Sequence, residues 1–397
     1  MRTTTARGLT ARRREIRSSS HFQVGLASCL LFGVLLSWCS SHFFSSNRQT
    51  PQPQQFLNPH LRPPASPSLP DDSPASQMGK SSNRQLQLDD QQEQQIISPE
   101  SSVTMDIETH HATMPLRLVS FNIRFATNKS ERALGEQPWE VRCPKVCAQL
   151  RFISAGHESP FLCLQESLYS QLNDIQAQLG KPWAHIGRGR GKGETDEEFS
   201  PIFYRSDTWA CEHSETRWLS STPERPSRGW DAALNRIVTI GLFSHRATDA
   251  KVVVMSTHFD HVGVEARKNS AKLLIKFADE WGRGRSRAQP PPSAVLVGGD
   301  FNSQPDDEAY KMMTAPGSGM SDVSGLVPEN KHYGNHLTYT SFGEPSEHPQ
   351  RIDFLFVQEP TTARVETFGV LANSFDDQIR FSDHRPVVSD LHIRIQT

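Results

Sequence analysis

The sequence is poor in cysteine and has no excess of basic residues. Only six of its 397 residues are cysteines, and none forms the paired CxxC pattern of a structural zinc site. The 42 Lys and Arg residues are balanced by 44 Asp and Glu residues, which gives a formal net charge of −2. Proteins that grip long nucleic acids usually carry a basic excess, because neutralising phosphates dominates that affinity. The composition therefore favours a small substrate or a short polymer segment.

Charge is also absent from one long segment near the N-terminus. Residues 22–44 contain no Asp, Glu, Lys or Arg, whereas residues 1–21 carry six arginines. An apolar run of this length is sufficient to cross a bilayer, and the basic flank predicts a cytoplasmic N-terminal tail. We therefore predict a transmembrane signal-anchor at 22–44, which places the rest of the chain in a lumen or outside the cell. The alternative is a cleaved signal peptide and a secreted protein.

The next segment, residues 45–113, is crowded with Pro, Gln and Ser and holds few apolar residues. Such a composition cannot bury enough surface to offset the loss of chain entropy, so we predict a disordered stalk. Residues 114–397 have recurring apolar runs and are numerous enough to bury a sizeable core. We assign this last segment to one catalytic domain.

The domain alternates strand-like apolar runs with helical stretches. Most of the runs are continuous rather than alternating, which is typical of strands that are covered on both faces. The pattern predicts a layered α/β fold. The expected strands begin at Leu116, Phe161, Pro201, Ile237, Val252, Ala294, Ile352, Val365 and Val387, and the expected helices are 139–155, 168–179, 265–281 and a short one near Asp306.

Polar side chains capable of chemistry stand where several of these apolar runs end. Asn122, Glu166 and His258 each close a run, and Asp300 with Asn302 closes the run that contains Gly298 and Gly299. Strand ends are where α/β sheets assemble ligand sites, because a rigid sheet aims side chains into one crevice. A carboxylate on a buried strand also needs a cation or strong hydrogen bonds. The competing interpretation of the Asn and His residues is a turn cap and a structural histidine.

The two glycines and the spacing of the GGDFN block make it the sharpest of these signals. Glycine allows close backbone approach, and we expect Asp300 and Asn302, two apart on an extended chain, to face the same side. Farther on, Asp383 and His384 precede the last strand, and Asp353 begins an earlier one from which it can orient a histidine. Asp activates water, and the Asn amide donates to an anionic oxygen.

Such an inventory suits the hydrolysis of phosphate esters. Anionic phosphoryl oxygens repel the attacking water, and the leaving oxygen develops charge, so a divalent cation held by carboxylates addresses both problems. The sequence has no HExxH motif and no cysteine cluster, which favours Mg²⁺ or Mn²⁺ over zinc.

The order of the motifs resembles the endonuclease/exonuclease/phosphatase superfamily. That superfamily groups pancreatic-type DNases, apurinic endonucleases, neutral sphingomyelinases, inositol polyphosphate phosphatases and deadenylase-type exonucleases. The resemblance implies a four-layer α/β sandwich, with two packed mixed sheets flanked by helices. The matching blocks are SFNI (120–123), LQES (164–167), STHFDH (256–261), GGDFN (298–302), RIDF (351–354) and SDHRPV (382–387).

The resemblance also implies roles at the matched positions. It makes Glu166 the principal metal ligand, with Asn122 beside it and Asp383 as a further ligand or as part of a second metal site. It makes Asp300 the group that activates water and Asn302 the group that steadies a phosphoryl oxygen. The implied phosphate contacts are His258, which also protonates the leaving oxygen, and His384, which Asp353 orients.

Within the superfamily, the segments 218–239 and 257–271 look like a poorly characterised branch common in microbes. They place Arg236 and Arg267 as candidate substrate contacts, against the alternatives of a strand cap and a solvated helix face. The loop 187–193 (GRGRGKG) offers three more cations, either as a phosphate-contacting lip or as an exposed turn. The sequence thus predicts a Mg²⁺-dependent phosphodiesterase or phosphatase, bound to a membrane through its N-terminal helix. The alternatives are a deadenylase-like 3′–5′ exonuclease and a sphingomyelinase or phosphoinositide phosphatase. Nothing in the sequence demands a protein partner.

Overall fold

The computed structural model describes residues 112–283, 290–358 and 363–395. The predicted basic tail, the membrane segment at 22–44 and the stalk up to residue 111 lie outside the described residues. Within the described ranges, no helix combines the length and apolar character needed to cross a bilayer. The first strand begins at Thr113, at the last residue of the predicted stalk, because Thr113 pairs with Arg394 at the far end of the final strand.

Two mixed β-sheets form the centre of the domain. In spatial order, the seven-stranded sheet holds β10 (His332–Gly334), β12 (Ala363–Val370), β13 (Val387–Arg394), β1 (Thr113–Asn122), β2 (Pro160–Gln165), β4 (Ile202–Arg205) and β3 (Trp183–Ile186). The six-stranded sheet holds β5 (Trp209–Trp218), β6 (Ile237–His245), β7 (Lys251–His258), β8 (Ala294–Asp300), β11 (Asp353–Gln358) and β9 (Met320–Asp322).

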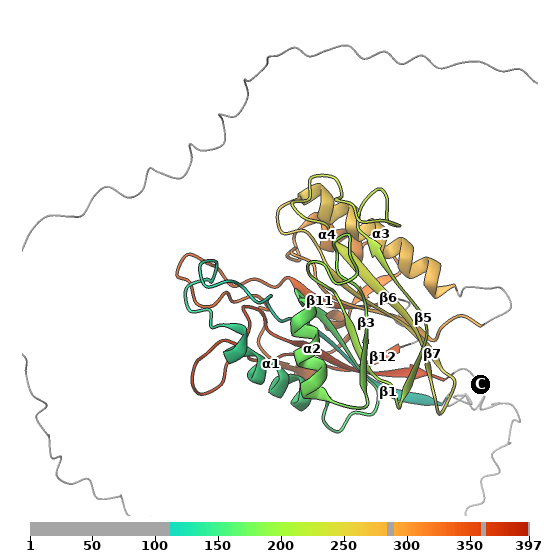
Figure 1. Ribbon diagram of the computed structural model, residues 1–397. Helices are drawn as coiled ribbons and strands as arrows, with labels where there is room; N and C mark the ends of the chain where they lie inside the picture. The colour runs from blue at the N-terminus through green and yellow to red at the C-terminus, as the bar shows by residue number, and fades with distance from the viewer. Residues whose placement is uncertain (1–111, 284–289, 359–362, 396–397) are drawn as a thin grey trace, which may run out of the picture. The chain divides into compact units, whose positions relative to one another are not determined.

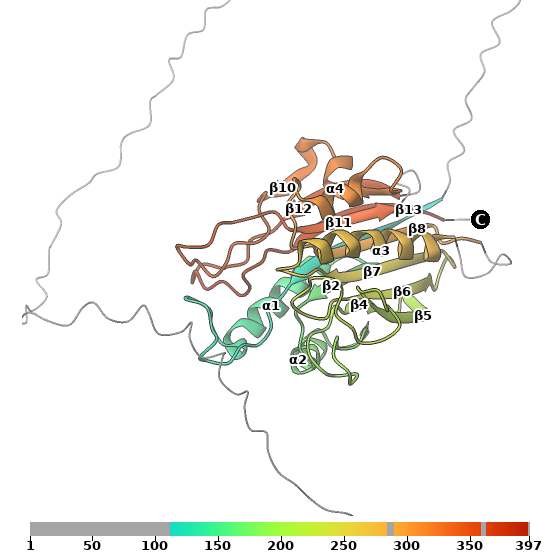
Figure 2. The same cartoon turned by 90° about the horizontal axis from the view of Figure 1, so that it is seen from above.

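Helices cover the outer face of each sheet. The helices α1 (Trp139–Ser154) and α2 (Tyr169–Leu179) pack on the seven-stranded sheet, and α3 (Val264–Gly282) and α4 (Glu308–Thr314) pack on the six-stranded sheet. Figures 1 and 2 show the resulting order of helix, sheet, sheet, helix. Two 3₁₀ turns, η1 (Val323–Leu326) and η2 (Glu329–Lys331), follow β9. The predicted four-layer α/β sandwich is confirmed.

The continuous apolar runs follow from this layering, because the central strands bury both of their faces. In β1, Leu116 and Leu118 enter the core between the two sheets, whereas Val119 and Phe121 pack beneath α1 and α2. A further group of buried apolar side chains lies on the outer face of the six-stranded sheet, where Leu274 and its neighbours on α3 pack. Each sheet is therefore fixed against a helix layer and against the other sheet.

All nine expected strands and all four expected helices are present within a few residues of their predicted bounds. Four strands, β3, β5, β9 and β10, have no counterpart among the predicted strands. Strands β9 and β10 have three residues each, too short for a periodic signal, and β3 and β5 carry partly exposed polar residues at the edges of their sheets. The four described cysteines are free, and Cys143 and Cys147 lie on α1 with their Sγ atoms 3.9 Å apart.

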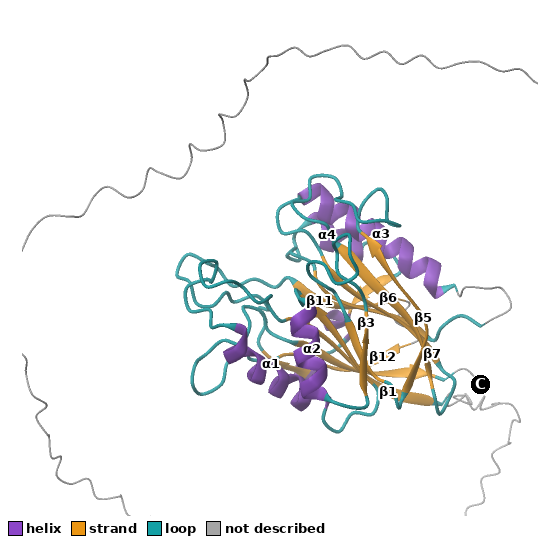
Figure 3. Ribbon diagram, in the orientation of Figure 1, coloured by secondary structure: helices purple, strands orange, loops and turns teal. Residues whose placement is uncertain are grey.

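Long loops gather where β1 ends. Figure 3 shows loops gathered at this end of the sheets, and the chain colours of Figure 1, in the same orientation, identify the segments 123–138 and 371–386 among them. The first segment follows β1 and the second precedes β13, its antiparallel neighbour. The polar strand-end side chains singled out in the sequence lie at this same end.

Candidate active site

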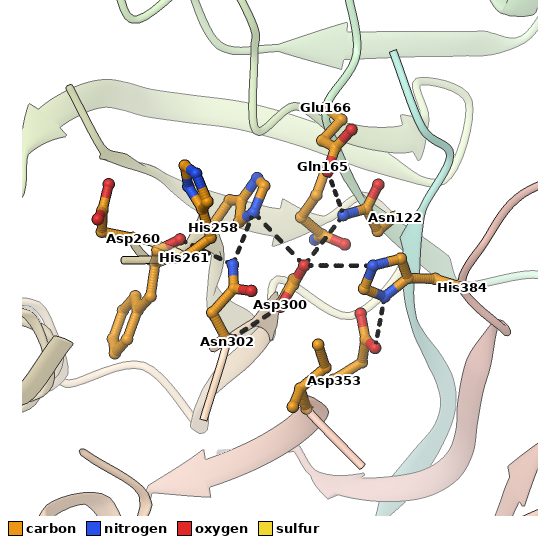
Figure 4. A network of polar contacts seen from close by, with 12 residues as sticks. Asn122, Gln165, Glu166, His258, Asp260, His261, Asp300, Asn302, Asp353 and His384 are labelled. Atoms are coloured by element: carbon orange, nitrogen blue, oxygen red, sulfur yellow. Dashed lines mark hydrogen bonds and ion pairs between the residues drawn. The ribbon is translucent and has the colours of Figure 1, made fainter. Parts of the chain in front are cut away.

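Strand register brings the predicted residues of the site together. Strands β1 and β2 run parallel and pair Asn122 with Gln165, which places Glu166 beside Asn122. Strands β7 and β8 also run parallel, and they pair His258 with Asp300. Strand β11 is antiparallel to β8 and begins opposite Asp300, with Asp353. Both sheets therefore deliver side chains to one crevice, as predicted from the strand ends (Figure 4).

Glu166 stands directly after β2 in a left-handed backbone conformation, with φ of 59°. Its Oε1 accepts a hydrogen bond from Nδ2 of Asn122 at 3.0 Å, and its Oε2 accepts one from the backbone N–H of Phe125 at 3.2 Å. The guanidinium of Arg124 lies 3.8 Å from the same carboxylate. Burial alone would raise the pKa of Glu166, but the charge of Arg124 and the Asn122 donor outweigh it and lower the pKa. Glu166 is therefore a carboxylate.

Asp300 occupies the centre of the cluster and is almost completely buried, with 1% of its surface exposed. Its Oδ2 accepts from Nδ2 of Asn122 at 3.0 Å and lies 3.4 Å from Nε2 of His258 and 3.7 Å from Nε2 of His384. Burial, followed by repulsion from Asp353, raises the pKa of Asp300 to about 7. A carboxyl group with a pKa near neutrality is suited to accept a proton.

Asn302 reaches the site by a different route from the one predicted. Its backbone φ is 45°, so the chain turns after β8 instead of continuing as an extended strand. The turn is closed by a hydrogen bond from the Asn302 backbone N–H to Oδ1 of Asp300 at 2.9 Å. The expectation that an extended chain places both side chains on one face was wrong, because this tight turn brings them together.

His258 is held between Asn302 and Glu198. Nδ2 of Asn302 lies 3.0 Å from Nε2 of His258 and donates to it, which leaves the proton of a neutral ring on Nδ1. Burial, with the nearby charge of Arg236 and Arg190, lowers the pKa of His258 well below its ordinary value. The neutral ring accepts at Nε2, so the expected role as proton donor to the leaving oxygen stays a prediction that requires the protonated ring.

His384 has the opposite environment. Its Nδ1 lies 2.8 Å from Oδ2 of Asp353, and its Nε2 faces Asp300. Burial alone would lower the pKa of His384, but the carboxylates of Asp353 and Asp300 outweigh it and raise the pKa well above its ordinary value. The imidazolium therefore carries an N–H at Nε2 that points into the crevice.

The donor set suits a hard divalent cation. Glu166 and Asp383 both line the crevice, and repulsion from Glu166 joins burial in raising the pKa of Asp383. One oxygen of Glu166, one oxygen of Asp300 and one nitrogen of His258 lie within 4.8 Å of one another. Buried carboxylates this close are stabilised by a divalent cation, and oxygen donors favour Mg²⁺ or Mn²⁺. Asn122 turns its amide nitrogen to the acids and accepts at Oδ1 from the Arg124 N–H at 3.0 Å, so its role as a direct ligand stays a prediction.

A cleft of about 710 Å³ extends from this cluster toward a basic wall. Arg236 is buried there, with its Nε 3.2 Å from Asp260 and one terminal nitrogen 2.8 Å from Nδ1 of His261. Arg267 projects from α3 into the same cleft and donates to the backbone carbonyl of Asp260 at 3.1 Å. Both arginines therefore line the cleft, in accordance with their selection as candidate substrate contacts.

Two further residues of the site, Glu198 and Arg124, are not among the predicted ones, and Arg190 is predicted only as one of the three cations of the GRGRGKG loop. Glu198 and the buried Arg190 line the cleft as an ion pair of 2.8 Å, and Arg124 flanks Glu166. Arg190 belongs to the GRGRGKG loop, and the sequence of this loop does not show which of its three cations points into the cleft. Glu198 lies four residues before β4 begins at Ile202, in a polar segment, and no pattern in the sequence marks it as part of the site.

Comparison with known proteins places the chain in a family. The model of the endonuclease/exonuclease/phosphatase family matches residues 119–384. An endonuclease/exonuclease/phosphatase from Bacteroides vulgatus is 32% identical, with a TM-score of 0.62, and the match covers 71% of this chain and 100% of that one. A mannosyl-6-phosphatase of Bacteroides thetaiotaomicron is 29% identical, with a TM-score of 0.60 and coverage of 70% and 99%.

A shorter match occurs with uncharacterized protein L388 of Acanthamoeba polyphaga mimivirus. The two sequences are 31% identical over 90 residues, which is 22% of this chain and 31% of the mimivirus protein. This chain therefore matches less than a third of that relative's length. The family match, in contrast, spans the domain from β1 to His384 and includes every residue of the central cluster. The chain belongs to the endonuclease/exonuclease/phosphatase family, whose members are hydrolases of phosphate esters.

Proposed function

We propose that this protein is a Mg²⁺- or Mn²⁺-dependent phosphatase that acts on a small hydroxylated substrate, a sugar phosphate. The observation that carries the proposal is the position of Asp300. A buried carboxyl group with a pKa of about 7 stands beside the acids that suit a cation and opposite a charged histidine. The choice of a sugar phosphate is supported by the likeness to the mannosyl-6-phosphatase along 99% of that protein.

The cation is assigned to Glu166 and Asp383, with Asn122 orienting Glu166. When bound, a divalent cation supplies positive charge against the anionic phosphoryl oxygens and the developing charge of the leaving oxygen. Asp300 then accepts a proton from the attacking water, for which its pKa is suited. His384 donates from Nε2 to a phosphoryl oxygen, while Asp353 holds its ring at Nδ1.

Asn302 holds the ring of His258 in place. Its amide nitrogen lies 3.0 Å from Nε2 of His258 and 3.0 Å from the backbone carbonyl of Phe259, so the amide plane is fixed before substrate binds. Both N–H groups of this amide are therefore engaged, and we assign Asn302 to orienting His258; contact of either side chain with a phosphoryl oxygen requires one of these hydrogen bonds to be exchanged.

The proposal is tested with the full-length chain in detergent on a panel of substrates. The panel holds mannose 6-phosphate, inositol phosphates, sphingomyelin and oligonucleotides, each with EDTA and with Mg²⁺. We expect release of phosphate from mannose 6-phosphate with Mg²⁺ and none with EDTA. Asp300→Asn should lower kcat by roughly 10²–10⁴-fold, which is the usual contribution of general base catalysis. Asp306→Asn, at an exposed position in the following loop, is the matched control.

Three results distinguish the alternatives. Wild-type turnover by Asp300→Asn on the cleaved substrate would disprove the assigned role of Asp300. Stepwise shortening of an oligonucleotide from its 3′ end would favour the exonuclease, and hydrolysis that rises on lipid vesicles would favour a lipid phosphoesterase. Metal assignment has a separate readout, because Glu166→Gln should weaken Mn²⁺ binding measured directly in the absence of substrate.

We also propose that residues 22–44 anchor the catalytic domain on the lumenal or extracellular side of a membrane. The proposal is supported by the uncharged run and the basic residues that precede it. Added protease should leave the catalytic domain intact in sealed vesicles and digest it after detergent is added. Digestion in sealed vesicles with the cytoplasmic face outward would reverse the orientation.

A further inference from the structure

A small recess lies against the wall of the catalytic cleft. Its volume is about 10 Å³, roughly the room needed for one water-sized group. Four of its side chains also line the cleft, so the recess adjoins the space in which a substrate would bind. The four shared side chains are Arg190, Glu198, Arg236 and His258, and Phe199, Ser200 and Ile237 complete the lining.

Arg236 offers this recess a free donor. Only 4% of the residue is exposed, and two of its nitrogens are engaged by Asp260 and His261. The remaining terminal nitrogen, Nη1, is buried and has no hydrogen-bond partner. A buried donor without a partner costs about 1–3 kcal/mol, so a ligand or a water molecule that accepts from it is strongly favoured.

Glu198 offers an acceptor. Its Oε1 is bound by Arg190 at 2.8 Å, whereas its Oε2 stands 3.9 Å from Nδ1 of His258. That distance exceeds the range of a direct hydrogen bond, so Oε2 is available to a group placed between the side chains. The recess thus combines one unused N–H with one available carboxylate oxygen and about the space of one oxygen atom.

The local charges decide which kind of group fits. Arg236 is paired with Asp260, and Arg190 is paired with both Glu197 and Glu198. Each arginine is therefore already balanced by a carboxylate, and a second anion in the recess would face Glu198 without a compensating cation. A hydroxyl group, in contrast, accepts from Arg236 and donates to Glu198 without adding charge.

We propose that this recess binds a hydroxyl group of the leaving alcohol, and that Arg236 and Glu198 thereby select phosphate esters of polyols. The inference rests on the proposed phosphatase function and adds to it the residues that recognise the sugar. A site built to bond a hydroxyl discriminates strongly against substrates that lack one, because its buried polar groups are then left unpaired.

The test compares two substrates of the full-length chain with Mg²⁺, mannose 6-phosphate and p-nitrophenyl phosphate, which has no hydroxyl on its leaving group. The measured quantity is the ratio of their kcat/KM values. Glu198→Ala should lower this ratio by roughly ten- to a hundredfold, the size expected for one hydrogen bond to a charged group. Glu197→Ala is the matched control, because Glu197 also pairs with Arg190 but is half exposed and outside the recess.

A second variant covers the case in which Glu198→Ala fails to fold. Arg236→Lys keeps the charge near Asp260, but a single ammonium group cannot replace three separate nitrogens, so the ratio should fall similarly. A thermal melt of each variant establishes folding. An equal loss on both substrates, an unchanged ratio with a lower Tm (a structural water in the recess only), or the same fall in Glu197→Ala would each overturn the inference. Absence of metal-dependent hydrolysis in the wild type would instead overturn the proposed phosphatase function.

Discussion

His384 and Asp353 form a buried pair in which Nδ1 of the imidazole lies 2.8 Å from Oδ2 of the carboxylate. The two residues come from different parts of the fold, since Asp353 begins β11 and His384 precedes β13. The other oxygen of Asp353, Oδ1, is buried and has no hydrogen-bond partner. The imidazolium is therefore the principal partner of this carboxylate, and the carboxylate in turn fixes the ring.

Replacing the carboxylate should disable the histidine without removing it. In Asp353→Asn, the neutral amide can no longer stabilise the imidazolium, and we expect kcat to fall by roughly 10²–10⁴-fold. Steady-state kinetics on the substrate identified by the panel measures this loss. Asp322→Asn is a control, because Asp322 is also buried but pairs with Arg351 outside the catalytic cluster, and its kcat should change little. A wild-type kcat in Asp353→Asn would contradict the assigned role of the pair.

Arg142 should matter for stability and metal binding together. This fully buried guanidinium donates at 2.8–3.1 Å to backbone carbonyls of the segment that follows β1 and of the segment that precedes β13, those of Ile123, Arg124, Phe125, Gln137 and Phe381. Lysine cannot reach them all, so Arg142→Lys should lower the free energy of unfolding by about 2–4 kcal/mol. It should also raise the Mg²⁺ concentration needed for half-maximal activity.

Chemical denaturation and a Mg²⁺ titration check both expectations. Arg151→Lys, on the outer part of the same helix, should change neither quantity. If the Arg142→Lys variant is less stable but keeps the wild-type Mg²⁺ requirement, the hydrogen bonds of Arg142 stabilise the fold and do not contribute to metal binding.

Gly298 should be intolerant of a side chain, because it lies where the two sheets approach each other. A Cβ atom added there would stand 3.0 Å from Cβ and 3.2 Å from Sγ of Cys163 in β2. Gly298→Ala should therefore cost about 1–3 kcal/mol of stability and lower kcat, since it separates Asp300 from Glu166. Thermal melts and kinetics measure these effects. Gly325→Ala, where a Cβ meets nothing within 4 Å, should be neutral, and Cys163→Gly should restore part of the loss.

The Arg117–Asp390 pair, far from the catalytic cluster, predicts a pH dependence of stability. Asp390 accepts from Arg117 at 2.7 and 2.8 Å and from Thr367 at 2.9 Å. Burial alone would raise the pKa of Asp390, but these donors outweigh it and hold the pKa below 3.8. The stabilisation is therefore fully present above pH 3.8 and is lost as the pH falls through the lower pKa of the folded state.

Asp390→Asn should accordingly lower the free energy of unfolding near pH 7, by about 1 kcal/mol for a pair that is partly exposed. The difference between wild type and variant should shrink toward zero as the pH is lowered below the ordinary carboxyl pKa. Urea titrations at several pH values measure it. A difference that stays constant down to the lowest pH would show that the hydrogen bonds, and not the charge, stabilise the pair.

The sequence was most informative where local pattern and tertiary burial agree. The nine apolar runs became strands because both faces of the central sheets are covered, and the polar residues that end them converge because β1 with β2 and β7 with β8 run parallel. Short edge strands such as β9 and β10 escaped prediction, since their pairing depends on neighbours distant in the chain.

The sequence predicts the acids and histidines of the candidate site, but it does not predict the turn and the loop residues that surround them. Asn302 arrives through a left-handed turn that no alternation of residues reveals. Arg190 is held by Trp218 and Asn235, which donate to its backbone carbonyl, and Glu198 is held by its ion pair with Arg190, so neither position could be read from the polar segment that contains them. Contacts between distant loops, rather than local propensity, decide these cases.

Pairing of the first strand with the last has a consequence for biosynthesis. Strand β1 is flanked by β13, and Asp383 and His384 lie immediately before β13. When a nascent chain has emerged from the ribosome only as far as β12, it still lacks Asp383 and His384, and one edge of β1 is unpaired. Hydrolysis should therefore begin only when residues 383–394 have emerged, so an incomplete translation product could not attack cellular phosphate esters.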